Sequence, residues 1–174
     1  MKYLILAIVL MANMTPLAPA ADLPESTTYQ IRNVKYLELL RPRDANSANG
    51  TPIVLYPAQP WKCMTWRLQA AGESTVQLRN LFTSKTISAM ADTNAPRRFV
   101  TQVPLPKGTG ERPLWQFVKL ADGNYKIIES KSDEALTASK DEGEDEVKVV
   151  VAPWQDRDEQ KWILEKIDPQ NLTM

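Results

Sequence analysis

The stretch Tyr29-Gln30-Ile31-Arg32-Asn33 returns twice more along the chain in altered form. Its counterparts are Val76-Gln77-Leu78-Arg79-Asn80 and Tyr125-Lys126-Ile127-Ile128-Glu129, so that the three stretches begin 47 and then 49 residues apart. Each alternates large apolar side chains with polar ones, as a half-buried β-strand does. A fixed period of this length indicates a repeat architecture, so the sequence predicts three copies of one unit.

Each predicted copy ends near a tryptophan, and the tryptophans keep the same period. Trp66, Trp115 and Trp162 lie 49 and then 47 residues apart. A large aromatic side chain at one position of every copy is typical of packing around a common axis, so we expect the indole rings to fill a shared core. The units are predicted at about residues 28–71, 75–122 and 124–168.

Within each unit the apolar residues form short alternating runs that turn-forming residues separate. We expect strands at residues 29–33, 36–40, 53–56 and 64–68, then 76–80, 86–90, 99–103 and 115–120, and finally 125–129, 135–139, 147–152 and 162–167. Strands in three equivalent groups must close on themselves, because an open sheet would leave long unpaired edges. The predicted fold class is therefore all-β, specifically a β-trefoil, a six-stranded barrel capped by three hairpins.

The first twenty residues are predicted to be a secretory signal peptide. Lys2 precedes an apolar run, Tyr3 to Met14, and the small residues Ala18-Pro19-Ala20 then form a cleavage pattern. The run is shorter than the roughly 20 residues that a membrane-spanning helix needs. We therefore expect a secreted, extracellular protein with no membrane insertion.

The composition argues against several classes of function. The chain has no histidine, which removes the usual general base and the commonest zinc ligand. Its 21 basic and 21 acidic residues balance, so a nucleic-acid partner is not expected. We predict that the protein is not an enzyme and uses no cofactor or metal. Cys63, the single cysteine, is interpreted as a small buried residue, or alternatively as a bridge to another chain.

A dense acidic run spans Asp141-Glu142-Gly143-Glu144-Asp145-Glu146. The simplest interpretation is a solvated hairpin tip. A weak calcium site is the alternative, because hard oxygen ligands gather there, although the spacing does not match an EF-hand loop.

Three motifs resemble those of ricin B-chain-type lectins. Asn49-Gly50-Thr51-Pro52-Ile53-Val54-Leu55-Tyr56-Pro57 resembles the family's NGTPVVLYP stretch, and Gln160-Lys161-Trp162 resembles the Q-x-W motif that closes its repeats. Tyr36-Leu37-Glu38-Leu39 resembles the family's YLDV strand. The resemblance implies a β-trefoil that binds sugars. An acidic residue accepts hydrogen bonds from vicinal hydroxyls, an aromatic ring stacks on the sugar, and an amide pair before the tryptophan supplies further contacts.

In the first unit the resemblance places the acid at Glu38 and the aromatic platform at Tyr56, with Asn46 and Asn49 in the same predicted site. The amide pair falls on Cys63-Met64, which cannot make those hydrogen bonds.

In the second unit the acid position falls on Ser88, the platform near Gln102, and the amide pair on Arg112-Pro113. We expect no sugar site there, because none of these residues supplies the family's chemistry.

In the third unit the acid and platform positions fall on Thr137 and Ala152, and the amide pair on Glu159-Gln160. Trp154 lies two residues after the platform position. We expect Trp154 to be exposed for ligand binding, or alternatively to form a lid over the barrel end. We expect Gln160 to contact ligand and also to bond backbone within its own repeat. Since no unit has the full set, we expect a glycan other than the family's galactose.

The leading hypothesis is a secreted, non-catalytic protein that binds glycans or glycoproteins. The alternative is a β-trefoil protease inhibitor that docks an exposed loop stiffened by proline, either Pro104 to Gly108 or Arg41-Pro42-Arg43. A third hypothesis is the receptor-binding subunit of a secreted toxin.

Overall fold

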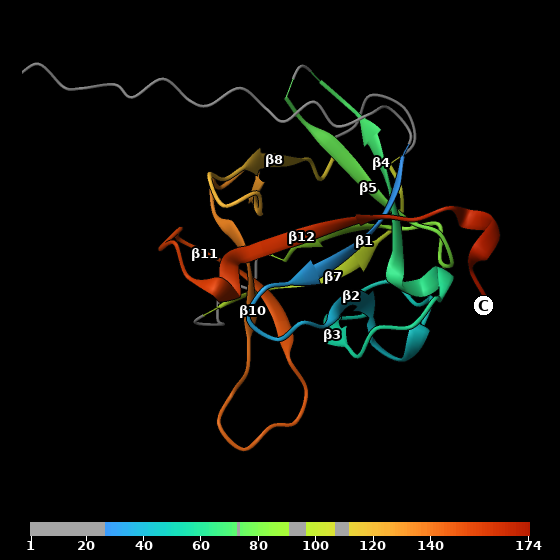
Figure 1. The fold of residues 1–174 in the computed structure, drawn as a ribbon, viewed down its shortest axis with the longest axis horizontal. Coiled ribbons are helices and arrows are strands. Elements are labelled where there is room, and N and C mark those ends of the chain that lie inside the picture. The colour runs from blue at the N-terminus through green and yellow to red at the C-terminus, as the bar shows by residue number, and fades with distance from the viewer. Residues whose placement is uncertain (1–26, 73, 91–96, 107–111) are drawn as a thin grey trace, which may run out of the picture.

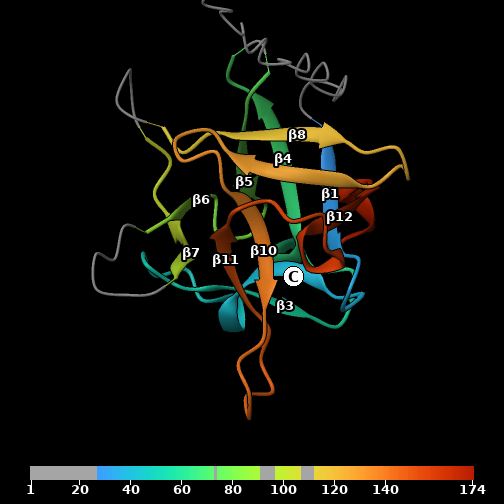
Figure 2. The same ribbon diagram turned by 90° about the vertical axis from the view of Figure 1, so that its left-hand side faces the viewer.

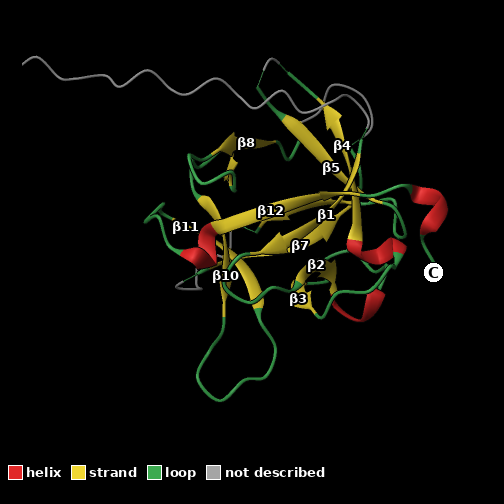
Figure 3. Ribbon diagram, in the orientation of Figure 1, coloured by secondary structure: helices red, strands yellow, loops and turns green. Residues whose placement is uncertain are grey.

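The computed structural model describes residues 27–72, 74–90, 97–106 and 112–174 (Figure 1). Its strands are β1 (Thr28–Asn33), β2 (Leu39–Pro42), β3 (Ile53–Tyr56), β4 (Thr65–Ala70), β5 (Val76–Asn80), β6 (Thr86–Ala89), β7 (Arg98–Val103), β8 (Trp115–Lys119), β9 (Tyr125–Glu129), β10 (Ala135–Ser139), β11 (Lys148–Ala152) and β12 (Lys161–Lys166). Short 3-10 helices lie at Arg43–Ala45, Lys62–Met64, Asp158–Gln160 and Pro169–Asn171. Strands dominate the described residues (Figure 3), as the alternating sequence pattern predicts.

Six strands close into a barrel. β1 pairs with β4 and with β12, and the ring continues from β4 through β5, β8 and β9 back to β12, with every pair antiparallel. The six remaining strands form the hairpins β2–β3, β6–β7 and β10–β11. This is the β-trefoil arrangement, with β1–β4 as the first unit, β5–β8 as the second and β9–β12 as the third.

The three hairpins are joined to one another as well as to the barrel. β11 pairs with β3 through Lys148 and Val54 and with β7 through Val150 and Phe99, and an isolated bridge links Pro52 to Thr101. Figure 2 shows the β10–β11 hairpin beside β3 and β7. The hairpins therefore form a layer with contacts among all three units.

The three tryptophans lie in the core, as predicted. Trp66, Trp115 and Trp162 are each 0% exposed and belong to one apolar cluster. Each indole Nε1 donates a hydrogen bond to a backbone carbonyl of its own unit's hairpin. The acceptors are Leu40 for Trp66 at 2.9 Å, Ile87 for Trp115 at 3.2 Å and Leu136 for Trp162 at 3.0 Å. Since the bond recurs in every unit, Leu40, Ile87 and Leu136 are structurally equivalent.

The turn after the first strand of each unit also recurs. In each unit the backbone amide of the strand's last residue donates to a carbonyl five residues ahead: Asn33 to Glu38, Asn80 to Lys85, and Glu129 to Glu134. The residue at the end of the turn has a positive φ in every unit: Leu37 (58°), Ser84 (58°) and Asp133 (59°). These bonds give a second set of equivalent positions that agrees with the tryptophan bonds.

One predicted strand is wrong in its bounds. The sequence predicts a strand at 36–40, whereas β2 begins at Leu39 and ends at Pro42. The cause is Asn33, whose Oδ1 accepts hydrogen bonds from the backbone amides of Lys35 and Tyr36 and so holds a turn there. Because Arg41 and Pro42 are buried in β2, the prediction that Arg41-Pro42-Arg43 is an exposed inhibitory loop is also wrong.

The acidic run between β10 and β11 projects from the body (Figure 1), and basic residues pair with it. Arg97 bonds Asp141 at 2.6 Å, Lys148 bonds Glu144 at 2.5 Å, and Arg43 bonds Glu146. Within the described ranges no group of acidic residues or cysteine is arranged to hold a metal ion.

Two other sequence predictions concern secretion and Cys63. The predicted signal peptide, residues 1–20, lies outside the described residues. No helix in the described part of the chain is long and apolar enough to cross a membrane. Cys63 is a buried free cysteine, packed with Leu39 and Met64.

The end of the chain packs on the first unit. Trp61 and Thr173 form a parallel bridge, the backbone amide of Lys62 donates to the Thr173 carbonyl at 3.0 Å, and the amide of Thr173 donates to the Pro60 carbonyl at 2.8 Å. With the β1–β12 pair, these bonds hold the two ends of the fold together.

Replacing a core tryptophan should destabilise the fold strongly. We expect Trp115→Ala to lower the free energy of unfolding by about 3–5 kcal/mol, because it leaves a large cavity. The measurement is urea unfolding followed by circular dichroism. Trp154→Ala is the matched control, since Trp154 lies outside the core cluster, and it should change the free energy much less. Equal effects of the two substitutions would contradict the shared-core assignment.

Candidate functional site

The indole bonds and the turn bonds show which residues of the three units are equivalent, and they correct the alignment of the first unit with the other two. Arg41, Ser88 and Thr137 each follow directly after the carbonyl that accepts the indole bond. The position that the resemblance assigns to an acid is therefore Arg41 in the first unit. Glu38 is equivalent to Lys85 and not to Ser88 or Thr137. The Tyr-Leu-Glu-Leu similarity misled because Tyr36 and Leu37 belong to the turn that follows β1, and not to β2.

Side chains of the first unit fill its own candidate site. The Arg41 side chain is 9% exposed, and its guanidinium carbon lies 3.7 Å from the centroid of the Tyr56 ring. Trp61 stacks near the same ring, with 6.1 Å between the two centroids. Cys63 and Met64 are buried at the positions of the amide pair. A cation therefore already covers one face of the Tyr56 ring, where a sugar was expected to stack.

The structure separates the residues predicted to form the first-unit site. Tyr56 and Glu38 lie at the open end of the β2–β3 hairpin, because Tyr56 pairs with Leu39. Asn46 and Asn49 lie in the loop at its other end, about 10 Å away for a strand of this length. These four residues therefore do not form one cluster.

The Asn46 and Asn49 side chains take part in the structure of the hairpin loop. Asn46 Oδ1 accepts from the Ala48 amide at 2.8 Å, and Asn49 Oδ1 accepts from Lys85 Nζ at 2.7 Å. Gln102 Nε2 donates to the carbonyls of Asn46 and Ala48, both at 2.6 Å. The loop is thus held against the second unit.

In the third unit a pocket of about 290 Å³ lies at the position that Arg41 and its neighbours fill in the first unit. Tyr36 of the first unit completes the lining of this third-unit pocket. Its lining is Tyr36, Thr137, Ala138, Ser139, Lys140, Ala152, Pro153, Gln155, Arg157, Glu159 and Gln160. The three positions of the third unit that the resemblance singles out, Thr137, Ala152 and the Glu159-Gln160 pair, all contribute to this lining.

Gln160 supports the wall of this third-unit pocket. It is 3% exposed, and its Nε2 donates to the Pro153 carbonyl at 2.9 Å and to Thr137 Oγ1 at 3.2 Å. Its Oε1 accepts from the Gln155 amide at 2.7 Å. The prediction that Gln160 bonds backbone of its own repeat is confirmed. Trp154 is not part of the lining, and Lys126 Nζ of β9 lies 5.4 Å from the centroid of its ring.

Glu38 acts electrostatically on the third-unit pocket. Burial raises the pKa of Tyr36, and the nearby carboxylates of Glu159 and Glu38 raise it further. Burial also raises the pKa of Glu38, while Lys140 opposes part of that shift. The structure thus brings Glu38 within electrostatic reach of the pocket that Gln160 supports, although the sequence placed it in a separate site.

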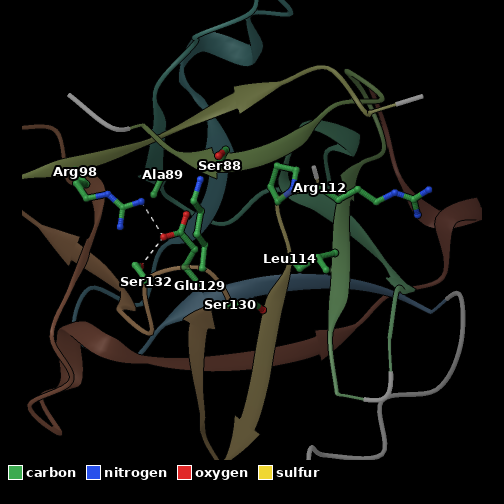
Figure 4. A pocket seen from close by; sticks show the side chains of 10 residues that line it. Ser88, Ala89, Arg98, Arg112, Leu114, Glu129, Ser130 and Ser132 are labelled. Atoms are coloured by element: carbon green, nitrogen blue, oxygen red, sulfur yellow. Dashed lines mark hydrogen bonds and ion pairs between the residues drawn. The ribbon is translucent and has the colours of Figure 1, made fainter. Parts of the chain in front are cut away.

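A larger pocket, of about 580 Å³, lies at the equivalent position of the second unit (Figure 4). Its lining is Ser88, Ala89, Arg98, Arg112, Pro113 and Leu114 of the second unit with Glu129, Ser130, Lys131 and Ser132 of the third. Figure 4 shows Arg98, Glu129 and Ser132 gathered on one side and Arg112 and Leu114 on the other. The sequence predicted no sugar site here, so this pocket was missed.

Glu129 is the residue at which the threefold pattern breaks. Its equivalents Asn33 and Asn80 donate from Nδ2 to the carbonyls of Glu159 at 3.0 Å and Cys63 at 2.8 Å. A carboxylate cannot donate such a bond. Glu129 is 5% exposed, and its Oε2 accepts from Arg98 Nη2 at 2.9 Å and from Ser132 Oγ at 2.5 Å.

The signal for this change is visible in the sequence. The repeated opening stretch ends in Asn, Asn and then Glu. An aligned position that changes from an amide to a buried carboxylate marks a place where the units differ in chemistry.

Comparison with solved structures identifies the fold independently. The designed threefold-symmetric protein ThreeFoil matches with a TM-score of 0.72 and 21% identity, over 80% of this chain and 99% of that chain. The Rhizoctonia solani agglutinin matches with a TM-score of 0.70 and 22% identity, over 84% and 98%. The Macrolepiota procera ricin B-like lectin, solved with lactose, gives 0.68 and 16%, over 84% and 99%.

These solved structures include lectins, and at such low identity the likeness shows the β-trefoil fold alone. No model of a known protein family matches the chain, and no curated protein sequence matches it.

The raised pKa of Glu38 predicts a pH-dependent effect on stability. Because the folded state favours protonated Glu38, its ionisation opposes folding above the folded pKa. We expect Glu38→Gln to raise the melting temperature near pH 7 and to change it little at about pH 4, where the carboxyl is largely protonated.

Glu134→Gln is the matched control at the equivalent position. Glu134 accepts a 2.6 Å bond from Arg98, so its substitution should lower stability at pH 7, by roughly 1 kcal/mol. A lower melting temperature for both variants at pH 7 would contradict the assignment of Glu38.

Proposed function

We propose that the protein is a secreted, non-catalytic, lectin-like protein that binds glycans or glycoproteins. In this proposal residues 1–20 are the signal peptide, and residues 28–168 are a ricin-type β-trefoil domain. The observation that carries the proposal is the pair of pockets at equivalent positions of the second and third units. Each lies between the hairpin of one unit and the turn of the following unit, where the resemblance expects a sugar.

The third-unit pocket has the size and polarity that a monosaccharide requires. Its volume of about 290 Å³ is at the lower end of the range for small-ligand sites. The half-buried Tyr36 ring offers a flat apolar surface, and Glu159 and Lys140 offer an acceptor and a donor for hydroxyl groups. Gln160 fixes the Pro153–Gln155 wall and leaves these groups to meet the ligand.

A shallow site of this kind binds a single sugar weakly. An affinity in the millimolar range, about −4 kcal/mol, is typical for so few directional contacts. Two sites on one rigid body would raise the affinity for a branched or clustered glycan, because the second binding event becomes intramolecular. The lectins among the structural neighbours support this proposal, since one of them was solved with lactose.

The proposal is tested on a glycan array and then by calorimetry with the best monosaccharide. We expect Tyr36→Ala to weaken binding at least tenfold, about 1.4 kcal/mol, because it removes the stacking surface. Tyr56→Ala is the matched control, since Arg41 covers a face of that ring, and binding should persist. Array binding that stays at background for the wild-type protein would overturn the proposal. Loss of binding on Tyr56→Ala alone would move the site to the first unit.

A further inference from the structure

The Glu129 carboxylate, which lines the second-unit pocket, is bonded on one oxygen only. Its side chain is 7% exposed, and Oε2 accepts from Arg98 Nη2 at 2.9 Å and from Ser132 Oγ at 2.5 Å. In Figure 4 both dashed lines end on one oxygen of Glu129. Within the described part of the chain no hydrogen bond reaches Oε1, and Oε1 is not one of the sealed polar atoms that lack a partner. Oε1 is therefore open to a molecule that enters the pocket.

The cations of this pocket are already engaged within the protein. Arg98 bonds Glu134 at 2.6 Å as well as Glu129, so that one guanidinium serves two carboxylates. Arg112 and Lys131, the other cations of the lining, have interactions of their own, and neither is free. The open oxygen of Glu129 is therefore the polar group that the pocket offers most directly to a ligand.

We propose that the second-unit pocket binds an uncharged saccharide through a hydroxyl group that donates to Glu129 Oε1, and that Glu129 makes the pocket select neutral sugars over acidic ones. The proposal rests on the lectin-like function given above and deepens it, because it names the acceptor and the ligand class of one of the two pockets. The acceptor comes from the third unit, whereas the acid position that the resemblance assigns to the second unit holds Ser88.

Glu129 is positioned for this role before a ligand arrives. It is the last residue of β9, and the two donors that hold its Oε2 come from two elements, Arg98 from β7 and Ser132 from the turn after β9. Because the acceptor is already ordered, little side-chain freedom is lost on binding. A hydroxyl that donates to a carboxylate forms a charge-assisted bond, roughly twice as strong as a bond between neutral groups.

An uncharged ligand fits the lining better than a charged one. A carboxylate on the ligand would be repelled by Glu129 and an ammonium by Arg98, whereas a hydroxyl group is repelled by neither. The apolar atoms of Ala89, Pro113 and Leu114 give one face of a pyranose ring a surface on which to pack. The volume of about 580 Å³ is within the range of small-ligand sites and leaves room for a hexose.

The test follows the amide chemical shifts of Ser88 and Ser132 in the full chain. The probes are the methyl glycosides of glucose, galactose and mannose, and we expect at least one of them to shift both amides with an affinity of about 1–10 mM. The uronate of the same configuration should bind about tenfold more weakly, because Glu129 repels its carboxylate. The fully O-methylated form of the best glycoside should leave both amides unchanged, since it has no hydroxyl to donate.

Glu129→Gln keeps the shape of the side chain and removes its charge. Binding of the neutral glycoside should weaken about fivefold, and the preference for it over the uronate should disappear. A purely structural role of Glu129 would not change that preference. Glu134→Gln is the matched control, because it also removes a carboxylate partner of Arg98 but lies outside the lining. Both the affinity and the preference should remain in this control.

A second variant, Glu129→Asn, separates binding from folding. It gives the third unit the asparagine that the first and second units have as Asn33 and Asn80, each of which bonds a backbone carbonyl of the neighbouring unit. We expect this variant to melt at the wild-type temperature or above it and to lose binding in the second-unit pocket. Thermal melts of all three variants accompany the binding measurements.

A response of Tyr36 and Glu159 to the neutral glycosides without any response of Ser88 and Ser132 would overturn the inference and leave the third-unit site standing. Equal binding of the glycoside and its uronate, or wild-type binding by both Glu129 variants, would also overturn it without touching the proposed function. No response of either pocket, with array binding at background, would overturn the proposed function and the inference together.

Discussion

The bond from each buried indole to a hairpin carbonyl is the interaction on which the rest of the structure depends. A tryptophan buries roughly 150–250 Å² of surface, and its buried N–H needs a partner. Leu40, Ile87 and Leu136 supply that partner at the same place in every unit. The bond ties each hairpin to the barrel in one register, so it also fixes which side chains face outward beside it. The pockets of the second and third units occur at the same place for this reason.

The three units have equivalent backbones beside the hairpin, but their side chains at this position differ. In the first unit Arg41 lies over Tyr56 and closes the site. Gln160 supports a wall of the third-unit pocket, and Pro113 takes its place at the second-unit pocket. Glu129 of the third unit, which also lines the second-unit pocket, replaces the asparagine of the turn. The barrel tolerates these changes because they lie outside the tryptophan core. One scaffold therefore presents a closed site in the first unit and two pockets with different linings in the second and third units.

The sequence predicted the fold well because its signals are local and periodic. The alternation in Val76–Asn80 and the spacing of the tryptophans reflect contacts that every unit repeats. The candidate sites were predicted less well, because they depend on contacts between units. The turn after β1 includes Tyr36 and Leu37, so that Glu38 is equivalent to Lys85 and not to Ser88, and no pattern within residues 36–40 shows this. The bond from Arg98 to Glu129 joins residues 31 positions apart, so neither residue alone predicts the second-unit pocket.

The pairing of β1 with β12 has a consequence for how the chain reaches its folded state. Arg32 and Glu165, which bond across this pair, are 133 residues apart in sequence. During synthesis β1 emerges long before its neighbour, and until β12 arrives the barrel has an open seam with unpaired backbone groups. Such an edge can recruit a strand from another nascent chain. Because this pair joins residues from the two ends of the domain, the topology favours slow folding, and neighbouring chains can associate through the exposed edge before the barrel closes.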